Sequence, residues 1–214
     1  MLARKKLVIM GDSISDCGRA KPVGEGLFGA LGRGYISLFD ALAQVDHPEW
    51  GLRVVNMGID GNTSRDLLAR WETDVNAQNP DIVAVLIGIN DVWRQFDSPF
   101  QPESHVLPEE YAANLRRIAA QQAEHPYRLV FLSPFFLEPH CQDPMRARMD
   151  EYGAIMRTVA QENGIPFVDL QQAFAALLEN FYPGYLTWDR VHPNEVGQLV
   201  IARQLMQAVE PLLG

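Results

Sequence analysis

One residue near the start of the sequence and two near its end have the types that nucleophilic catalysis requires. A serine hydroxyl is a poor nucleophile at neutral pH, so it needs an adjacent base, and the base needs an orienting partner. Ser13 follows a glycine and an aspartate near the start of the chain, and Asp189 lies three residues before His192. Pro193 disfavours helical geometry at His192. We therefore expect Asp189 and His192 on a turn, with the carboxylate near Nδ1 and with Nε2 free for Ser13.

Acyl transfer also needs hydrogen-bond donors for the negative charge that develops on the carbonyl oxygen. The sequence offers the backbone amides of Ser13 and Gly58 and the side-chain amide of Asn90. Taken singly, Ser13 is more typical of a helix cap, and Asp189 with His192 of a surface ion pair. Gly58 and Asn90 are each typical of turns. A purely structural role explains the joint occurrence of these residues less well, because they lie at the ends of predicted strands or just before the last predicted helix.

Short apolar runs predict the sheet that would bring these residues together. The expected strands cover residues 7–10, 53–56, 81–87, 128–133 and 166–169. Strands that are apolar on both faces are typical of a parallel sheet covered by helices. Expected helices run from Thr63 or Ser64 to about residue 76, from Pro108, from Asp143-Pro144 to Asn163-Gly164, and from Asn194 to about Val209. We predict an α/β fold, a three-layer α/β/α sandwich of flavodoxin-like type, with ligands beyond the carboxyl ends of the strands.

Composition narrows the class of partner. The chain has 214 residues, 47% of them hydrophobic, and no long linker or repeat, so we expect one domain over residues 1–214. Its formal net charge of −9 disfavours nucleic acid and anionic membranes as partners and favours a neutral small molecule. Cys17 and Cys141 form no disulfide framework or paired metal-ligand motif, and the apolar run 7–10 is too short for a signal peptide. We expect a cytoplasmic protein without a metal or cofactor.

Four sequence blocks resemble the SGNH (GDSL-type) hydrolase family, in the family's order. They are Gly11-Asp12-Ser13, the glycine of Asn56-x-Gly58, Gly88-x-Asn90-Asp91 and Asp189-x-x-His192. The resemblance covers about residues 6–210. It implies that Ser13 is the nucleophile, His192 the base and Asp189 its orienter, with Ser13, Gly58 and Asn90 forming the oxyanion hole. The Gly-x-Ser-x-Gly elbow of ordinary α/β-hydrolases is absent.

Segments outside these blocks look like the bacterial intracellular acetylxylan esterases of the same family. They are residues 16–19, 88–95, 142–146 and 188–193. The similarity implies a serine esterase that removes acetyl groups from short xylan-derived sugars through an acyl-enzyme, and a homo-oligomer that can reach an octamer. Two alternatives stay open: a lysophospholipase- or thioesterase-type enzyme on other acyl esters, and a non-catalytic carbohydrate-binding protein.

Four further residues are candidates for substrate contact. Trp93 and Arg94 follow Asn90 closely and could meet a sugar ring, although Trp93 could equally belong to the core. Trp188 precedes Asp189 and could wall a small acyl pocket. Asp12, directly before Ser13, is the fourth candidate.

Two loops could shape the pocket or the surface. The glycine-rich segment 18–34 could be a mobile rim beside Ser13, with Asp16 and Arg19 as polar contacts, or a structural crossover. The aromatic segment 181–185 could serve a subunit interface or pack as a loop.

Overall fold

A five-stranded, all-parallel sheet forms the centre of the computed structural model, which describes residues 4–213. The strands are β1 (Lys6–Gly11), β2 (Arg53–Gly58), β3 (Ile82–Leu86), β4 (Arg128–Leu132) and β5 (Phe167–Val168), in the order β2-β1-β3-β4-β5. All residues of β3 and all but the first of β1 are buried, as expected for strands covered on both faces. The five predicted strands are confirmed.

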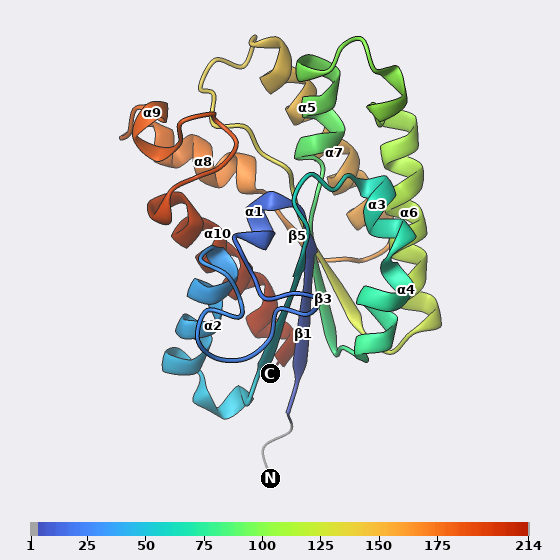
Figure 1. Ribbon diagram of the computed structural model, residues 1–214, viewed down its shortest axis with the longest axis vertical. Coiled ribbons are helices and arrows are strands. Elements are labelled where there is room, and N and C mark those ends of the chain that lie inside the picture. Colours follow the sequence, from blue (N-terminus) through green and yellow to red (C-terminus); the bar gives the residue numbers. More distant parts are fainter. Residues whose placement is uncertain (1–3, 214) are drawn as a thin grey trace.

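Helices cover both faces of this sheet (Figure 1). Helices α2 (Tyr35–Asp46), α8 (Leu170–Leu178) and α10 (Glu195–Leu213) lie on one side, and α3 (Ser64–Ala69), α6 (Pro108–Glu124) and α7 (Pro144–Glu162) on the other. The predicted α/β/α sandwich is confirmed. Within residues 4–213 no helix combines the length and the apolar character that crossing a bilayer would need.

Three helices begin where the sequence signals place them. Asp143 caps α7, because its side chain accepts hydrogen bonds from the amides of Met145 and Arg146. Asn194 caps α10 through a hydrogen bond of 3.1 Å from the Val196 amide to its Oδ1. Helix α6 begins at Pro108, whose missing N–H has no role in a first helical turn.

The helix predicted from Thr63 or Ser64 to about residue 76 is interrupted. Thr63 forms a capping box with Asp66, but α3 ends at Ala69 and a separate short helix, α4 (Trp71–Asp74), follows. Arg70 has a non-helical conformation at the junction. Its guanidinium donates to the carbonyl oxygens of Met57 at 2.7 Å and Gly11 at 3.1 Å, which fastens the junction to the ends of β1 and β2.

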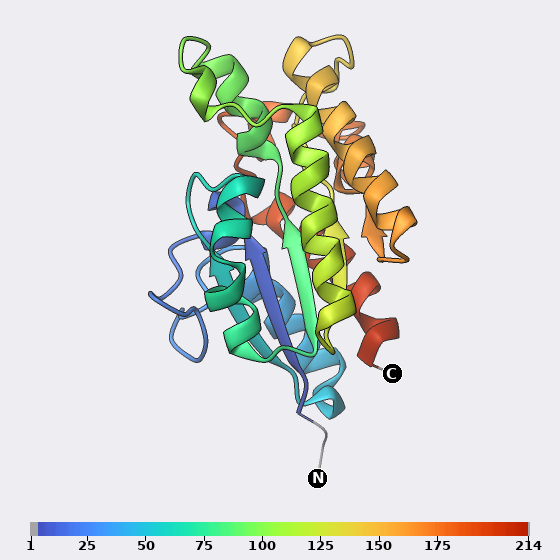
Figure 2. The ribbon, with the colours of Figure 1, turned by 90° about the vertical axis from the view of Figure 1, so that its right-hand side faces the viewer.

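The centre of the sheet has the order that places ligands in open α/β folds. β1 lies between β2 and β3. The connection after β1 therefore leads to β2 on one side, and the connection after β2 leads back across to β3 on the other side, which is the strand order where such folds bind ligands. Gly11 is in register with Gly58 on β2 and with Leu86 on β3. Figure 2 shows the arrowheads of β1, β2 and β3, which mark their carboxyl ends, at a common edge of the sheet.

Candidate active site

Ser13, His192 and Asp189 form one hydrogen-bonded chain. Ser13 is the first residue of the short helix α1 (Ser13–Asp16), and its Oγ lies 2.8 Å from Nε2 of His192. The other ring nitrogen, Nδ1, lies 2.5 Å from Oδ2 of Asp189. The histidine side chain is 34% exposed and the aspartate 7% exposed, so the serine end of the chain faces solvent and the carboxylate end is covered.

Asp189 is surrounded by hydrogen-bond donors. Its Oδ1 accepts from the amides of Val191 at 2.9 Å and His192 at 2.8 Å, and from the Thr187 hydroxyl at 2.9 Å. Burial alone would raise the pKa of this carboxyl, but the hydrogen bonds from His192, Val191 and Thr187 outweigh it and lower the pKa. The carboxylate is therefore ionised at neutral pH and can fix the tautomer of the imidazole.

The segment after β4 fixes the loop that carries Asp189 and His192. Arg190 adopts a left-handed conformation with φ 65°, which is uncommon for a residue with a side chain. Its carbonyl oxygen accepts from the Leu137 amide at 2.9 Å, and its guanidinium pairs with Glu138 at 2.7 Å. The sequence does not reveal this anchor, because no spacing signal connects residues about fifty positions apart.

Hydrogen bonds from buried side chains stabilise the turn that carries Ser13. Asp12 caps α1, because its Oδ1 accepts from the Ile14 amide at 3.0 Å and its carbonyl oxygen from the Ser15 amide at 3.1 Å. Asn56 on β2 donates to the Ser15 carbonyl at 2.7 Å. Among the described residues the amide of Ser13 has no partner, as is usual at the first position of a helix, so it is available to a ligand.

The prediction that Asp12 contacts substrate is wrong. Its side chain is fully buried beneath the turn, where no ligand can reach it. One oxygen, Oδ2, has no hydrogen-bond partner among residues 4–213. Burial is the main cause that raises the pKa of this carboxyl to about 7.

The prediction that Gly58 donates to the oxyanion is also wrong. Gly58 is the buried last residue of β2, and its amide donates to Oδ1 of Asn56 at 2.8 Å. A Cβ at this position would lie 2.7 Å from the carbonyl carbon of Ser15. The glycine is therefore needed for the close approach of α1 to β2, and its N–H is already used.

A second glycine, three residues later, has the free amide that Gly58 lacks. Gly61 is exposed, has φ 75°, and belongs to the turn that the Asn62 amide closes on the Ile59 carbonyl at 3.2 Å. No hydrogen bond engages the Gly61 amide within the part of the chain that the structure describes. The turn lies at the site, because the Ile59 amide donates to the carbonyl of Gly11 at 3.1 Å. The sequence signal for this residue was that residues 58–61 contain a second glycine, Gly61, three positions after Gly58.

Asn90 lies beside that turn, in the first turn of α5 (Ile89–Asp97). Its Nδ2 donates to the carbonyl oxygen of Asn62 at 3.0 Å, and its Oδ1 accepts from Arg94 at 3.4 Å. An amide nitrogen carries two hydrogens, so a second donor remains for a ligand. The turn containing Gly61 and the side chain of Asn90 thus share one edge of the site.

The other three predicted substrate contacts, Trp93, Arg94 and Trp188, differ in how exposed they are and in how close they lie to the site. The ring of Trp93 is partly buried, and its centroid lies 6.0 Å from that of His192, so this residue does border the site. The Arg94 guanidinium lies 5.1 Å from the Trp93 ring centroid. Trp188 is 87% exposed, so it does not wall a pocket in this chain, although it stands directly before Asp189.

The segment 18–34 is fastened to the sheet. Arg19 is buried, and its Nε donates to the Gly58 carbonyl at 2.6 Å. Asp16 is also buried and pairs with Lys21. Both side chains therefore bind their own chain, and the prediction that they make polar contacts in the pocket is wrong.

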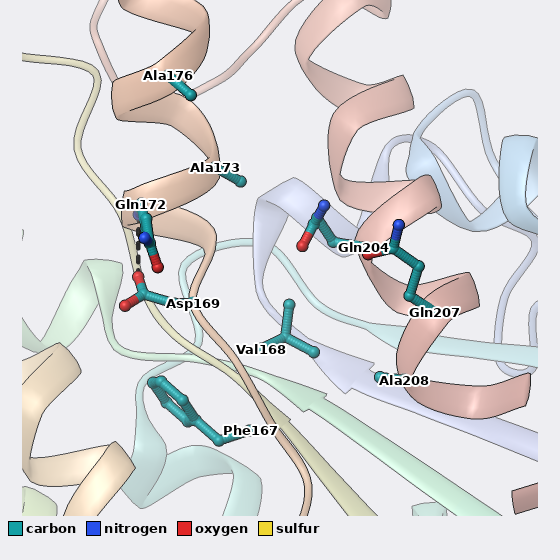
Figure 3. A pocket seen from close by; sticks show the side chains of 9 residues that line it. All are labelled: Phe167, Val168, Asp169, Gln172, Ala173, Ala176, Gln204, Gln207 and Ala208. Carbon is teal, nitrogen blue, oxygen red and sulfur yellow. Dashed lines mark hydrogen bonds between the residues drawn. The ribbon is translucent and has the colours of Figure 1, made fainter. Parts of the chain in front are cut away.

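A cavity lined by other residues is shown in Figure 3. It lies between β5, α8 and α10 and has a volume of about 530 Å³. Gln172, Gln204 and Gln207 line it, together with Asp169, whose side chain accepts a hydrogen bond from the Gln172 amide. None of the predicted site residues lines this cavity, and its lining holds no serine, cysteine or histidine.

Known proteins resemble this chain in sequence and in structure. Residues 9–200 match the model of the GDSL-like lipase/acylhydrolase family. An acetylxylan esterase of Geobacillus stearothermophilus is 50% identical over 96% of this chain and 94% of its own length. The crystal structure of that organism's acetylxylan esterase Axe2 matches with a TM-score of 0.94, at the same identity and coverage.

Related solved structures extend the comparison. They include catalytic mutants of Axe2 in which a histidine, a serine or an aspartate is replaced by alanine. LAE5, an alpha/beta hydrolase from the metagenome of Lake Arreo in Spain, is 50% identical over 97% of this chain and 96% of its own, with a TM-score of 0.94. This chain belongs to the GDSL-like lipase/acylhydrolase family and is a carboxylic ester hydrolase.

Proposed function

We propose that this esterase removes acetyl groups from acetylated xylo-oligosaccharides, with Ser13 as the nucleophile. The observation that carries the proposal is the hydrogen-bonded chain from Ser13 Oγ through His192 to Asp189. The substrate class is supported by the acetylxylan esterase of Geobacillus stearothermophilus, which is 50% identical over 96% of this chain.

The first half of the reaction forms an acetyl-enzyme. Nε2 of His192 takes the proton of Ser13 Oγ as the oxygen attacks the acetyl carbonyl carbon. Asp189, ionised and hydrogen-bonded to Nδ1, stabilises the imidazolium that results. Collapse of the tetrahedral intermediate breaks the ester bond, and the imidazolium gives its proton to the departing sugar oxygen.

The second half releases acetate. A water molecule gives its proton to Nε2 of His192 and attacks the acetyl-enzyme carbonyl carbon. The second tetrahedral intermediate expels Ser13 Oγ, which takes the proton back from the imidazolium. The enzyme thus returns to its starting state with one ester bond hydrolysed.

The negative oxygen of both intermediates needs preorganised donors. We assign this role to the amide of Ser13, the side-chain Nδ2 of Asn90 and the amide of Gly61. The first and third have no partner among the described residues, and Asn90 has one hydrogen left after its bond to Asn62. Gly61 thereby takes the role predicted for Gly58.

Acetate release from acetylated xylo-oligosaccharides tests this function. Wild-type protein should release acetate from them faster than from other acetylated sugars, and Ser13→Ala should lose at least about three orders of magnitude in rate while it keeps its fold. An acyl-length series on activated esters separates the competing enzyme class. A rate that rises steeply beyond butyryl would contradict the acetyl assignment, and a Ser13→Ala variant near the wild-type rate would contradict the mechanism.

We further propose that copies of this chain assemble with one another, and we retain the expectation of a cytoplasmic location. Support for assembly is the exposed aromatic surface around α9 (Pro183–Leu186), where Tyr182, Tyr185 and Trp188 are 81%, 60% and 87% exposed. Light scattering coupled to size-exclusion chromatography would measure the mass in solution. A mass of one chain at micromolar concentration would contradict this proposal.

A further inference from the structure

Arg94 contacts the side chain of Asn90 from within the same helix. It lies four residues later, a spacing that puts both side chains on one face of α5. Its Nη2 donates to Oδ1 of Asn90 at 3.4 Å, while its Nη1 pairs with Asp97 at 2.8 Å. The guanidinium is therefore held between the asparagine at the reaction site and an acid three residues farther along the helix.

This contact bears on which way the Asn90 amide faces. An asparagine that donates to an oxyanion loses this function when its side-chain amide rotates by a half-turn, because the oxygen and the nitrogen then exchange places. Arg94 is a donor without acceptor capacity and stays charged, and the carbonyl of Asn62 is an acceptor only. In the reversed orientation Nδ2 would face the guanidinium and Oδ1 would face the carbonyl oxygen. Both neighbours therefore select the same orientation of the amide.

The position of Arg94 leaves one of its own donors unused. Its Nε is buried and has no hydrogen-bond partner among residues 4–213. An unpaired buried donor costs free energy, and such a group in a folded protein calls for an explanation. The guanidinium contacts Asn90, Asp97 and the Trp93 ring, and in this position its own hydrogen bonding is incomplete.

We propose that Arg94 is a positioning residue of the oxyanion hole, which fixes the Asn90 amide with its N–H toward the reacting oxygen. The inference rests on the proposed oxyanion role of Asn90, and it replaces direct sugar binding by Arg94. A donor that is already oriented needs no reorganisation as charge develops. Its loss of orientation should therefore lower kcat and leave KM nearly unchanged.

A double-mutant cycle on an activated acetyl ester tests this. Asn90→Ala alone should lower kcat at least about a hundredfold. Arg94→Met alone should lower kcat about tenfold with KM within about twofold, because one weak, long hydrogen bond is lost. Combined with Asn90→Ala, Arg94→Met should have no further effect, since the amide it positions is gone. Arg148→Met is the matched control, because Arg148 also pairs with an acid three residues later, Glu151 at 2.8 Å, but on α7.

Each outcome is decisive. An Arg94→Met effect that persists in full in the Asn90→Ala background, or that appears in KM, would mean that Arg94 acts on the substrate itself. Wild-type kinetics for Arg94→Met would also overturn the proposal. Near wild-type kcat for Asn90→Ala would instead overturn the oxyanion role on which it rests. If Arg94→Met does not fold, Asp97→Asn frees the guanidinium without touching the amide, and it should lower kcat by a smaller factor that again vanishes in the Asn90→Ala background.

Discussion

The loop that carries His192 and the turn that carries Ser13 are stabilised in different ways. The loop that carries His192 is partly exposed, and its acid, Asp189, accepts hydrogen bonds from an imidazole, two amides and a hydroxyl. The turn that carries Ser13 is supported from below, and its acid, Asp12, is fully buried with one oxygen unpaired. The pKa of the first carboxyl is lowered and that of the second is raised to about 7.

This difference separates a residue that serves the chemistry from one that serves the fold. A carboxylate that must orient and stabilise an imidazolium has to stay charged, and only a dense set of donors keeps it so after burial. A carboxyl that only caps a helical turn needs one oxygen for the Ile14 amide and can hold a proton on the other. Position next to a catalytic residue in the sequence is therefore no guide to the role of an acid.

The largest effect should come from Asp189→Asn. The substitution preserves shape but removes the charge and favours the wrong imidazole tautomer, so we expect kcat to fall by about three to four orders of magnitude. Steady-state kinetics on an activated acetyl ester measures this, with the thermal unfolding midpoint as a control for folding. A loss below about tenfold would mean that Asp189 does not assist His192.

A smaller effect, on stability, should follow from Gly58→Ala. The added Cβ would meet the backbone of Asp16 and Ser15 and push α1 away from β2, which we expect to cost about 2 kcal/mol of unfolding free energy. Denaturant unfolding measures it. Gly153→Ala, in the middle of α7, is the matched control. A Cβ there would lie 3.9 Å from Ser133, an ordinary contact, so this substitution should stabilise the protein by about 0.5 kcal/mol. Equal stability of the two variants would show that the Ser13 turn is not tightly packed.

Asp12→Asn should change the pH dependence of stability. The folded-state pKa of about 7 exceeds the ordinary value of 3.8, so the folded state binds the proton more tightly than the unfolded chain. Stability that is complete below about pH 4 is therefore lost as the pH rises through about 7. Asparagine keeps an acceptor for Ile14 but does not ionise.

Chemical unfolding at about pH 4 and about pH 8 measures this difference. The variant should lose less stability than the wild type over this range, by on the order of 4 kcal/mol. Some loss should remain, because burial raises the pKa of the neighbouring Asp91 to about 7 as well. Identical losses in both proteins would mean that Asp12 is ionised in the folded state.

The sheet could be predicted because its signal is local. Runs such as residues 82–86 are apolar at every position, which only a strand buried on both faces tolerates. The interruption at Arg70 could not be predicted, because it depends on carbonyl groups at the ends of two distant strands. Helices α2 and α5 follow glycines and have no side-chain cap that could mark their starts. Helix α8 is capped by Asp169, but this residue was also the last of the strand expected over residues 166–169.

The site could be predicted in part for the same reason. The types and spacing of Ser13, Asp189 and His192 indicate a chemistry, and the structure places Ser13 and Asp189 each within hydrogen-bond distance of His192. The choice between Gly58 and Gly61 depends on which backbone amide is free. That depends on the side chain of Asn56, which accepts from one of them, and sequence does not report such partners.

Labelling with a serine-directed fluorophosphonate tests whether Ser13 is the activated nucleophile. The reagent reacts only with a serine hydroxyl that a neighbouring base activates, and peptide mapping by mass spectrometry locates the adduct. We predict one label per chain, on Ser13, with esterase activity lost in proportion to labelling and with no label on the Ser13→Ala variant. An active enzyme that resists labelling, or that carries its label on another residue, would contradict the account.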